Sequence, residues 1–521
     1  MVITDLTSVA LELVFRHVIG NKIKSLEAWK KYLPFLAVNR VWREAALPQL
    51  YSFGIISFVV KDSETLVNTN IELIISNGGR QLIGGLRITS THTITLELIV
   101  AETNKLLSPV TSLQWPGIRT IAIDCPENAN ITSAVPTPAA VSAMLNSLPN
   151  IADIYIDHPH YQDAKTIGIC SKIVNYYKHQ LTNIYTNIEV YFLESHPIPQ
   201  LTSIDLLLGS QAANQLPYMC ADSLRILRLY CIPHTMSWRY FQMDMTSDVI
   251  LFNNLESLNL VFNEDAIKRY STVWTDQHMN TRRLYNFYCP KLKKVMLKDC
   301  PPCFSLSQPD TCATLTQFIF CGSISALVNC GGLNFDATTT LSVDILGTDL
   351  FGDMKKFYKV TNRIFSSCIE AKKSCMALNW LKFGTNFSKV RWELLTNLEI
   401  KPSIIFKLLM DLIYRLPNLI TLAVRDVQLI ISSNIGLLSL RNELQQILEK
   451  PLDSKIESLL LDSKNGTSDG MYRVFQTMLI QIKSLKKLQV PEVLIETANK
   501  CKENMPYQYS HSADVEIQTW K

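Results

Sequence analysis

Residues 254–263 read NLESLNLVFN, and residues 291–300 read KLKKVMLKDC. In both stretches an aliphatic residue is followed by two variable residues, a second aliphatic residue, one variable residue and a third aliphatic residue. The last two, such as Leu258 and Leu260, are two positions apart, so both point to one face of a short strand. The first, such as Leu255, lies in the turn before the strand and fills the same core. We call this spacing of three aliphatic residues the phrase. It predicts a short strand with one buried face.

The same phrase returns along most of the chain. Its aliphatic positions are Ile83, Leu86, Ile88; Ile118, Ile121, Ile123; Ile151, Ile154, Ile156; Leu201, Ile204, Leu206; Leu224, Leu227, Leu229; Leu255, Leu258, Leu260; Leu292, Val295, Leu297; Leu315, Phe318, Phe320; Leu395, Leu398, Ile400; Leu419, Leu422, Val424; Ile456, Leu459, Leu461; and Leu485, Leu488, Val490. Most neighbouring copies lie about 20 to 37 residues apart, which brackets the period of leucine-rich repeats. Apolar stripes at helical spacing, such as the one from Met471 to Leu479, lie between copies. One strand and one helix per unit predict an α/β leucine-rich-repeat solenoid, a right-handed horseshoe. An ordinary α/β domain with a leucine-rich core is the alternative.

Residues 1–55 carry a different pattern, which predicts an all-α module of short amphipathic helices. Residues 6–15, LTSVALELVF, and residues 32–51, YLPFLAVNRVWREAALPQLY, resemble the two halves of the F-box motif. In the second half, Trp42 and Pro48 stand where that motif has its tryptophan and its closing proline. The N-terminal module is therefore expected to be F-box-like.

An F-box followed by leucine-rich repeats is a familiar order in substrate receptors of SCF-type cullin–RING ubiquitin ligases. The resemblance implies that the module binds a Skp-type adaptor and joins a cullin scaffold, while the solenoid binds a protein target. Thr7, Val9 and Asn39 depart from the proline, acid and cysteine usual in the motif. The alternative is a leucine-rich-repeat scaffold, unconnected to ubiquitination, whose N-terminal helices only cap the solenoid. The residues expected to be divided between the internal core and the adaptor-binding face are Leu6, Leu11, Phe15, Leu36, Val38, Trp42 and Leu50.

These patterns divide the chain into four parts. The helical module, residues 1–55, is followed by a connecting segment, 56–80, by the solenoid, 81–495, and by a C-terminal tail, 496–521. Residues 347–394 contain no clean copy of the phrase, and the spacing of copies nearly doubles there. We expect a degenerate repeat or an inserted loop in that region.

Composition and motifs favour a binding protein over an enzyme. Charged residues make up 18% of the chain and the net charge is +4, without the clustered basic face typical of nucleic-acid binding. No apolar run approaches the roughly 18 residues of a membrane span, and the 13 cysteines show no regular pairing, which favours the cytoplasm or nucleus. Cys300-Pro-Pro-Cys303 supplies only half of a zinc site. We find no catalytic motif. We therefore expect no enzymatic activity, cofactor, metal, nucleic acid or membrane partner.

The variable residues of the phrase predict where a target binds. They face away from the core because side chains alternate across a strand, and stacked strands bring them into adjacent columns. In the central repeats these residues have a basic bias and one aromatic member, which suits an acidic or phosphorylated segment. A solvated charged face is the alternative. The predicted target-binding residues are Arg225, Arg228, Tyr230, Asn259, Lys293, Lys294 and Lys298.

Overall fold

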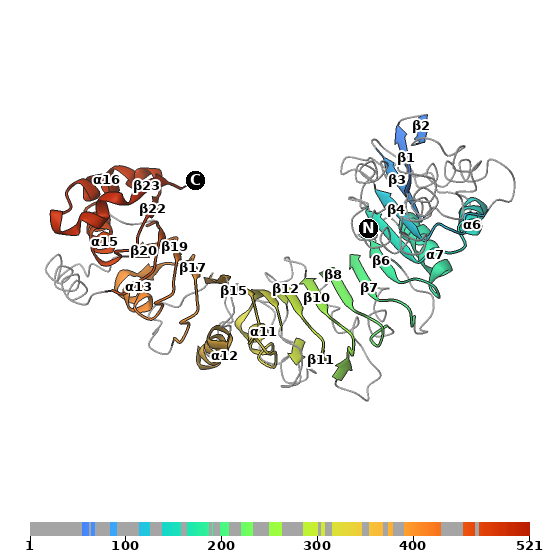
Figure 1. Cartoon of the computed structure of the whole chain (residues 1–521), viewed down its shortest axis with the longest axis horizontal. Coiled ribbons are helices and arrows are strands. Elements are labelled where there is room, and N and C mark those ends of the chain that lie inside the picture. The colour runs from blue at the N-terminus through green and yellow to red at the C-terminus, as the bar shows by residue number, and fades with distance from the viewer. Residues whose placement is uncertain are drawn as a thin grey trace, which may run out of the picture. The chain divides into compact units, whose positions relative to one another are not determined.

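The computed structural model describes residues 55–61, 64–67, 84–90, 114–124, 138–157, 164–186, 190, 198–207, 220–232, 249–262, 285–300, 304–307, 315–345, 354–367, 373–378, 390–428, 452–463 and 468–520. The chain divides into two compact units, Met1–Asp244 (unit 1) and Met245–Lys521 (unit 2). Both units are mixed α/β structures built on parallel strands, an arrangement compatible with a solenoid-like α/β fold (Figure 1). No helix in the described ranges is both long enough and apolar enough to cross a membrane.

Unit 1 contains a sheet with the strand order β2-β1-β3-β4-β5-β6-β7-β8. Only β2 runs antiparallel to its neighbour in this described sheet. The helices α6 and α7 lie on one side of the strands (Figure 1). The elements are β1 (Ile55–Lys61), β2 (Glu64–Val67), β3 (Gly85–Ser90), β4 (Thr120–Asp124), α6 (Pro138–Ser147), β5 (Asp153–Asp157), α7 (Ala164–Tyr177), β6 (Asn183–Thr186), β7 (Ser203–Leu207) and β8 (Ile226–Ile232).

Unit 2 repeats this architecture with the parallel order β10-β12-β14-β15-β16-β17-β19-β21-β22-β23. Two small parallel sheets, β13-β11-β9 and β18-β20, accompany it. The strands are β9 (Val249–Leu251), β10 (Ser257–Phe262), β11 (Tyr285–Tyr288), β12 (Lys294–Cys300), β13 (Phe304–Ser307), β14 (Gln317–Gly322), β15 (Thr340–Ile345), β16 (Lys373–Leu378), β17 (Asn397–Ile400), β18 (Ile404–Ile405), β19 (Thr421–Val424), β20 (Val427–Gln428), β21 (Ser458–Leu461), β22 (Lys487–Val490) and β23 (Glu516–Thr519). The helices are α11 (Ile324–Val328), α12 (Met354–Ser367), α13 (Phe406–Ile413), α15 (Ser468–Gln481), η7 (Glu492–Leu494), α16 (Ile495–Glu503) and η8 (Tyr507–Asp514).

The aliphatic positions of the phrase whose burial the structure describes are all buried in the core, as predicted. Leu258 aligns with Val295 in the next strand, and Val295 aligns with Phe318, so equivalent residues stack along the sheet. The first aliphatic residues, such as Leu255 and Leu292, are fully buried in the turns before the strands. The apolar stripe from Met471 to Leu479 lies on α15, and all five of its apolar side chains are buried.

The strand β6 lies among the repeats of unit 1 but lacks the full phrase, and it was not predicted. Leu181, in the turn before β6, and Ile184 and Thr186 within β6 occupy the three inward positions, and all three are buried. A threonine at the third position hides this copy, because the aliphatic pattern stops after the second residue. Thr186 is also β-branched, so it fits a strand as well as valine does.

The strands β15 and β16 lack the full phrase, because Thr338 stands three residues before Leu341 and Lys373 stands three residues before Met376. Val343 of β15 aligns on one side with Phe320, the third aliphatic residue of its phrase. On the other side it aligns with Met376, which in turn aligns with Leu398, the second aliphatic residue of its own phrase. The phrase therefore shifts by two residues across these strands. A shift of two keeps the same side chains on the buried face, whereas a shift of one would reverse them.

Two predicted boundaries fall within described elements, that at residues 55/56 in β1 and that at residues 495/496 in α16. The connecting segment, 56–80, includes most of β1 and all of β2, and both strands join the sheet of unit 1. The tail, 496–521, includes β23, which pairs with β22. The F-box-like module of residues 1–55 lies outside the described residues, apart from the first residue of β1.

Candidate interaction surface

The variable residues of unit 1 form a row across one face of the sheet, as strand alternation requires. Ala122, Tyr155, Tyr185, Asp205 and Arg228 are aligned in register from β4 to β8, and we call this row the β4–β8 face. Tyr155 and Tyr185 lie side by side, with ring centroids 6.2 Å apart and planes inclined by 32°. Tyr155 is 40% exposed. The face therefore presents an aromatic pair to solvent.

A carboxylate lies beside this pair. Asp153 is two residues before Tyr155 on β5, so both side chains are on the same face. Its Oδ2 accepts a hydrogen bond from the Thr120 hydroxyl at 3.2 Å. Its Oδ1 accepts hydrogen bonds from the Thr182 hydroxyl at 2.8 Å and from the Asn183 amide. Neutral donors on both neighbouring repeats thus fix the position of this negative charge.

An ion pair between Asp205 and Arg228 lies at the β8 end of the β4–β8 face. The Nη1 of Arg228 donates to Oδ2 of Asp205 at 3.2 Å. The Asp205 side chain is 11% exposed and that of Arg228 is 45% exposed. Burial raises the pKa of Asp205, and the hydrogen bond and charge of Arg228 lower it. The positive charge of Arg228 is therefore partly neutralised by Asp205.

The predicted target-binding residues fall in both units and at two kinds of position. Arg228 lies on the β4–β8 face, and Tyr230, two residues further along β8, is partly buried. Burial, followed by the charge of Asp205, raises the pKa of Tyr230. Arg225 instead immediately precedes β8 and is exposed.

The other four predicted residues belong to unit 2. Asn259 lies in β10 and Lys298 in β12, and both are partly exposed. Lys294, the first residue of β12, is exposed and makes no ion pair within the described ranges. Lys293 precedes the strand, like Arg225 in unit 1.

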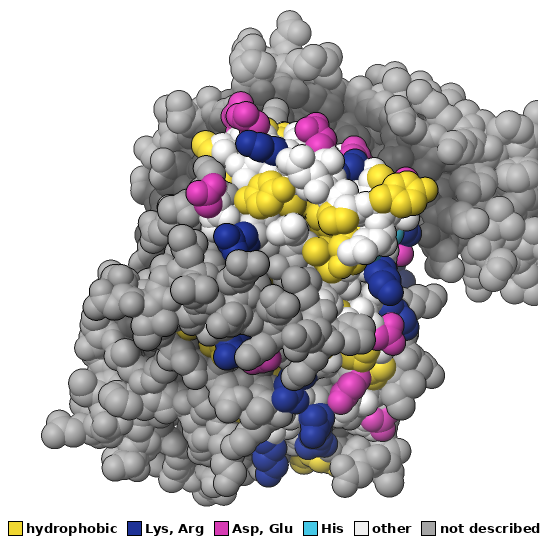
Figure 2. Space-filling view, turned by 90° about the vertical axis from the view of Figure 1, so that its left-hand side faces the viewer, with side chains coloured by type: hydrophobic (Ala, Val, Ile, Leu, Met, Phe, Trp, Pro, Cys, Tyr) yellow, Lys and Arg dark blue, Asp and Glu magenta, His cyan; other side chains and the backbone are white. Residues whose placement is uncertain are grey.

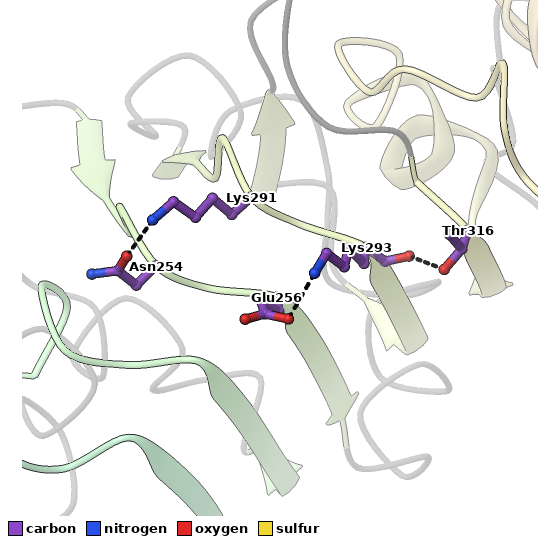
Figure 3. Close-up of polar contacts among 5 residues, drawn as sticks. All are labelled: Asn254, Glu256, Lys291, Lys293 and Thr316. Atoms are coloured by element: carbon purple, nitrogen blue, oxygen red, sulfur yellow. Dashed lines mark hydrogen bonds and ion pairs between the residues drawn. The ribbon is translucent and has the colours of Figure 1, made fainter.

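Lys293 takes part in a series of polar contacts along the starts of the unit 2 strands (Figure 3). Its Nζ donates to Oε2 of Glu256 at 3.0 Å, and its carbonyl oxygen accepts from the Thr316 hydroxyl at 3.0 Å. The Nζ of Lys291 donates to Oδ1 of Asn254 at 2.6 Å. Both lysines therefore pair with the residue at the equivalent position of the preceding repeat, on either side of the first aliphatic residue.

The same two contacts recur nearer the C-terminus. Lys455 donates to Asn418 at 2.8 Å, in the position of the Lys291–Asn254 contact. Lys486 lies 2.9 Å from Glu457, in the position of the Lys293–Glu256 contact. Recurrence at equivalent sites indicates a role within the repeat. We therefore interpret Lys293 as a residue that joins neighbouring repeats.

The C-terminal part of unit 2 presents a second mixture of apolar and charged groups (Figure 2). Val493 of η7 is 84% exposed and Tyr507 of η8 is 95% exposed. Arg425, which follows β19, donates from Nε to Glu399 at 3.1 Å. Its guanidinium carbon also lies 4.7 Å from the centre of the Trp520 ring.

The described residues contain no cluster of three or more histidine, cysteine or acidic side chains that could hold a metal ion. Cys289 and Cys330 are buried, and burial raises the pKa of both thiols, that of Cys330 to about 12. Such thiols are protonated near neutral pH and act as small apolar core residues. Cys303 and the predicted adaptor-binding residues lie outside the described ranges.

The aromatic pair and Asp153 were not among the predicted site residues. Tyr155 could have been predicted from the alternation of side chains that identified Arg228. Tyr155 occupies the position of Arg228 in its own copy of the phrase. Tyr185 lies in β6, whose copy the aliphatic pattern hides. No protein-family description and no curated protein matches this chain.

Proposed function

We propose that the chain is a protein-interaction adaptor in which a leucine-rich-repeat solenoid presents a target-binding surface. The supporting observation is the register of the parallel strands, which aligns buried phrase residues and places one variable side chain per repeat in each exposed row. A row of this kind allows many surface chemistries on one core, because its members can change without disturbing the aliphatic positions. In this proposal the chain itself carries no catalytic residue.

The finer proposal is that the chain is the substrate receptor of an SCF-type ubiquitin ligase. It is supported by the F-box resemblance of residues 6–15 and 32–51. The N-terminal module binds the Skp-type adaptor, and the repeats hold the target. Tethering raises the effective concentration of the target near a conjugating enzyme, so ubiquitin transfer becomes quasi-intramolecular.

Co-expression of the full chain with a Skp-type adaptor tests this proposal. The adaptor is expected to co-purify with the chain, and Trp42→Ala is expected to reduce its recovery. Tyr507→Ala is the matched control, because it also removes an aromatic side chain but lies at the other end of the sequence. A folded chain that retains no adaptor would leave the scaffold alternative, in which the N-terminal helices only cap the solenoid.

A further inference from the structure

The outer side of the Tyr155 ring is open. Tyr185 flanks the ring on the β6 side, at 6.2 Å between centroids. On the β4 side its register partner is Ala122, whose single methyl group is too short to cover an aromatic ring. Tyr155 accordingly keeps 40% of its surface exposed. An exposed aromatic face inside a row of otherwise small or paired side chains is suited to receive a ligand group.

Within the part of the chain that the structure describes, no cation neutralises the negative charge beside this ring. Asp153 accepts hydrogen bonds from Thr120, Thr182 and Asn183, all of which are neutral. No lysine or arginine of the described chain forms an ion pair with it. The adjacent acid, Asp205, differs in this respect, because Arg228 already pairs with it. Hydrogen bonds from neutral donors hold the Asp153 carboxylate in place and leave its charge available.

An aromatic ring and a carboxylate that pairs with no described cation, both on one face, favour the same kind of ligand. A cation is attracted to the negative face of an aromatic ring, and a carboxylate forms its strongest hydrogen bonds with guanidinium or ammonium groups. Burial, followed by the charge of Asp153, raises the pKa of the Tyr155 hydroxyl, so the field of this carboxylate reaches the ring's polar end. A cation beside Tyr155 would experience both attractions.

We propose that Tyr155, Tyr185 and Asp153 form a docking site for a lysine or arginine side chain of a partner protein. This inference rests on the proposed interaction function and specifies the chemistry of its target. An acidic or phosphorylated segment is disfavoured here, because it would approach Asp153 while the nearest cation of the row, Arg228, is already paired. A proline-rich segment could stack on the tyrosines but would not need the carboxylate.

Selection of a random twelve-residue peptide library on the immobilised full chain tests the site. We expect the recovered peptides to be enriched in lysine or arginine. The best peptide is then synthesised, and its affinity is measured by fluorescence anisotropy against the original chain and its variants. Asp153→Asn retains the size of the side chain and one of its two acceptor oxygens while removing its charge. Both Asp153→Asn and Tyr155→Leu are expected to weaken binding by about tenfold.

Tyr176→Leu is the matched control for the aromatic change. Tyr176 is 49% exposed in the same unit but lies on α7, where its hydroxyl donates to Asn146 at 2.9 Å. Its replacement is expected to leave peptide affinity unchanged, and replacing the peptide's basic residues by glutamine should abolish binding. Circular dichroism of each variant confirms that the fold is retained.

Peptides rich in proline, or peptides bound equally well by Asp153→Asn, would overturn the proposal, as would a selection that yields no Asp153-dependent binder. Co-purification of the Skp-type adaptor with Asp153→Asn distinguishes the docking-site proposal from the proposed ligase function. Retained adaptor with lost peptide binding is the expected result. An original chain that binds peptides in an Asp153-dependent way but retains no adaptor would contradict the ligase function alone.

Discussion

The guanidinium of Arg425 lies 4.7 Å from the centre of the Trp520 ring, although Arg425 follows β19 and Trp520 follows β23. The strands β21 and β22 lie between them in the sheet. Trp520 therefore extends back across two strands, and its backbone N–H donates to Val490 at 3.0 Å. The contact links the last described strand to the body of unit 2.

This relationship predicts that Trp520 stabilises the C-terminal strands. Trp520→Ala removes both the cation–π contact and apolar burial, so we expect a loss of about 1–3 kcal/mol in local stability. Hydrogen exchange of the β22 and β23 amides measures this loss directly. Tyr507→Ala, at a side chain that is 95% exposed, is the control and is expected to change stability by less than about 0.5 kcal/mol. Equal exchange rates in Trp520→Ala and the original chain would contradict the prediction.

Substitution of the repeat leucines should lower the stability of the fold far more than substitution of the residues next to them. Leu258 and Leu422 are essentially inaccessible to solvent, and Leu→Ala at either position should cost roughly 2–5 kcal/mol. Ala423, next to Leu422, is on the opposite side of β19 and partly exposed, so Ala423→Ser should remain within about 0.5 kcal/mol. Urea unfolding followed by circular dichroism compares the variants. Similar losses at Leu422 and Ala423 would mean that alternation does not govern the sheet.

The aliphatic phrase predicted most of this sheet because buried positions dictate residue type. Leu258 and Val295 have to be apolar wherever the chain is packed, so their spacing reveals the strand. The phrase could not reveal β6, where Thr186 is buried, or β15 and β16, where Thr338 and Lys373 stand in place of the first aliphatic residue. The pattern also could not predict which residues of different repeats contact one another. Glu256 and Lys293 are far apart in sequence, and only strand alignment brings them together.

Arg228 should contribute more to the free energy of unfolding at neutral pH than at acidic pH. Removing it by Arg228→Gln raises the pKa of Asp205 further above its ordinary value of 3.8, because burial then acts without an opposing cation. A raised folded-state pKa means that the folded chain binds the proton more tightly than the unfolded chain. Stability therefore falls as pH rises from 3.8 to the folded-state pKa.

We expect Arg228→Gln to lose about 1 kcal/mol at neutral pH, a value reduced by the exposure of the arginine. The deficit should shrink as the pH falls toward the ordinary carboxyl range. Thermal unfolding of the variant and the original chain across that range gives the measurement. A deficit that is constant with pH would show that Asp205 does not sense Arg228.

The buried thiols predict slow alkylation of the folded chain. Burial raises the pKa of Cys220, Cys330 and Cys501 to about 12, so the reactive thiolate is scarce near neutral pH and the sulfur is shielded from reagent. Iodoacetamide labelling followed by peptide mass spectrometry should leave all three unmodified in buffer and modified in urea. Raising the pH toward 9 should accelerate labelling only in urea. Rapid labelling in buffer would place these cysteines outside the core.

The adaptor function is tested most directly by isothermal titration of the purified full chain with a purified Skp-type adaptor. The account predicts a one-to-one complex, weakened by at least about tenfold in Trp42→Ala, because this change removes an aromatic side chain that the proposal assigns to adaptor binding. Tyr507→Ala should bind like the original chain. Absence of measurable binding by a chain whose circular dichroism and cooperative unfolding show that it is folded would contradict the account.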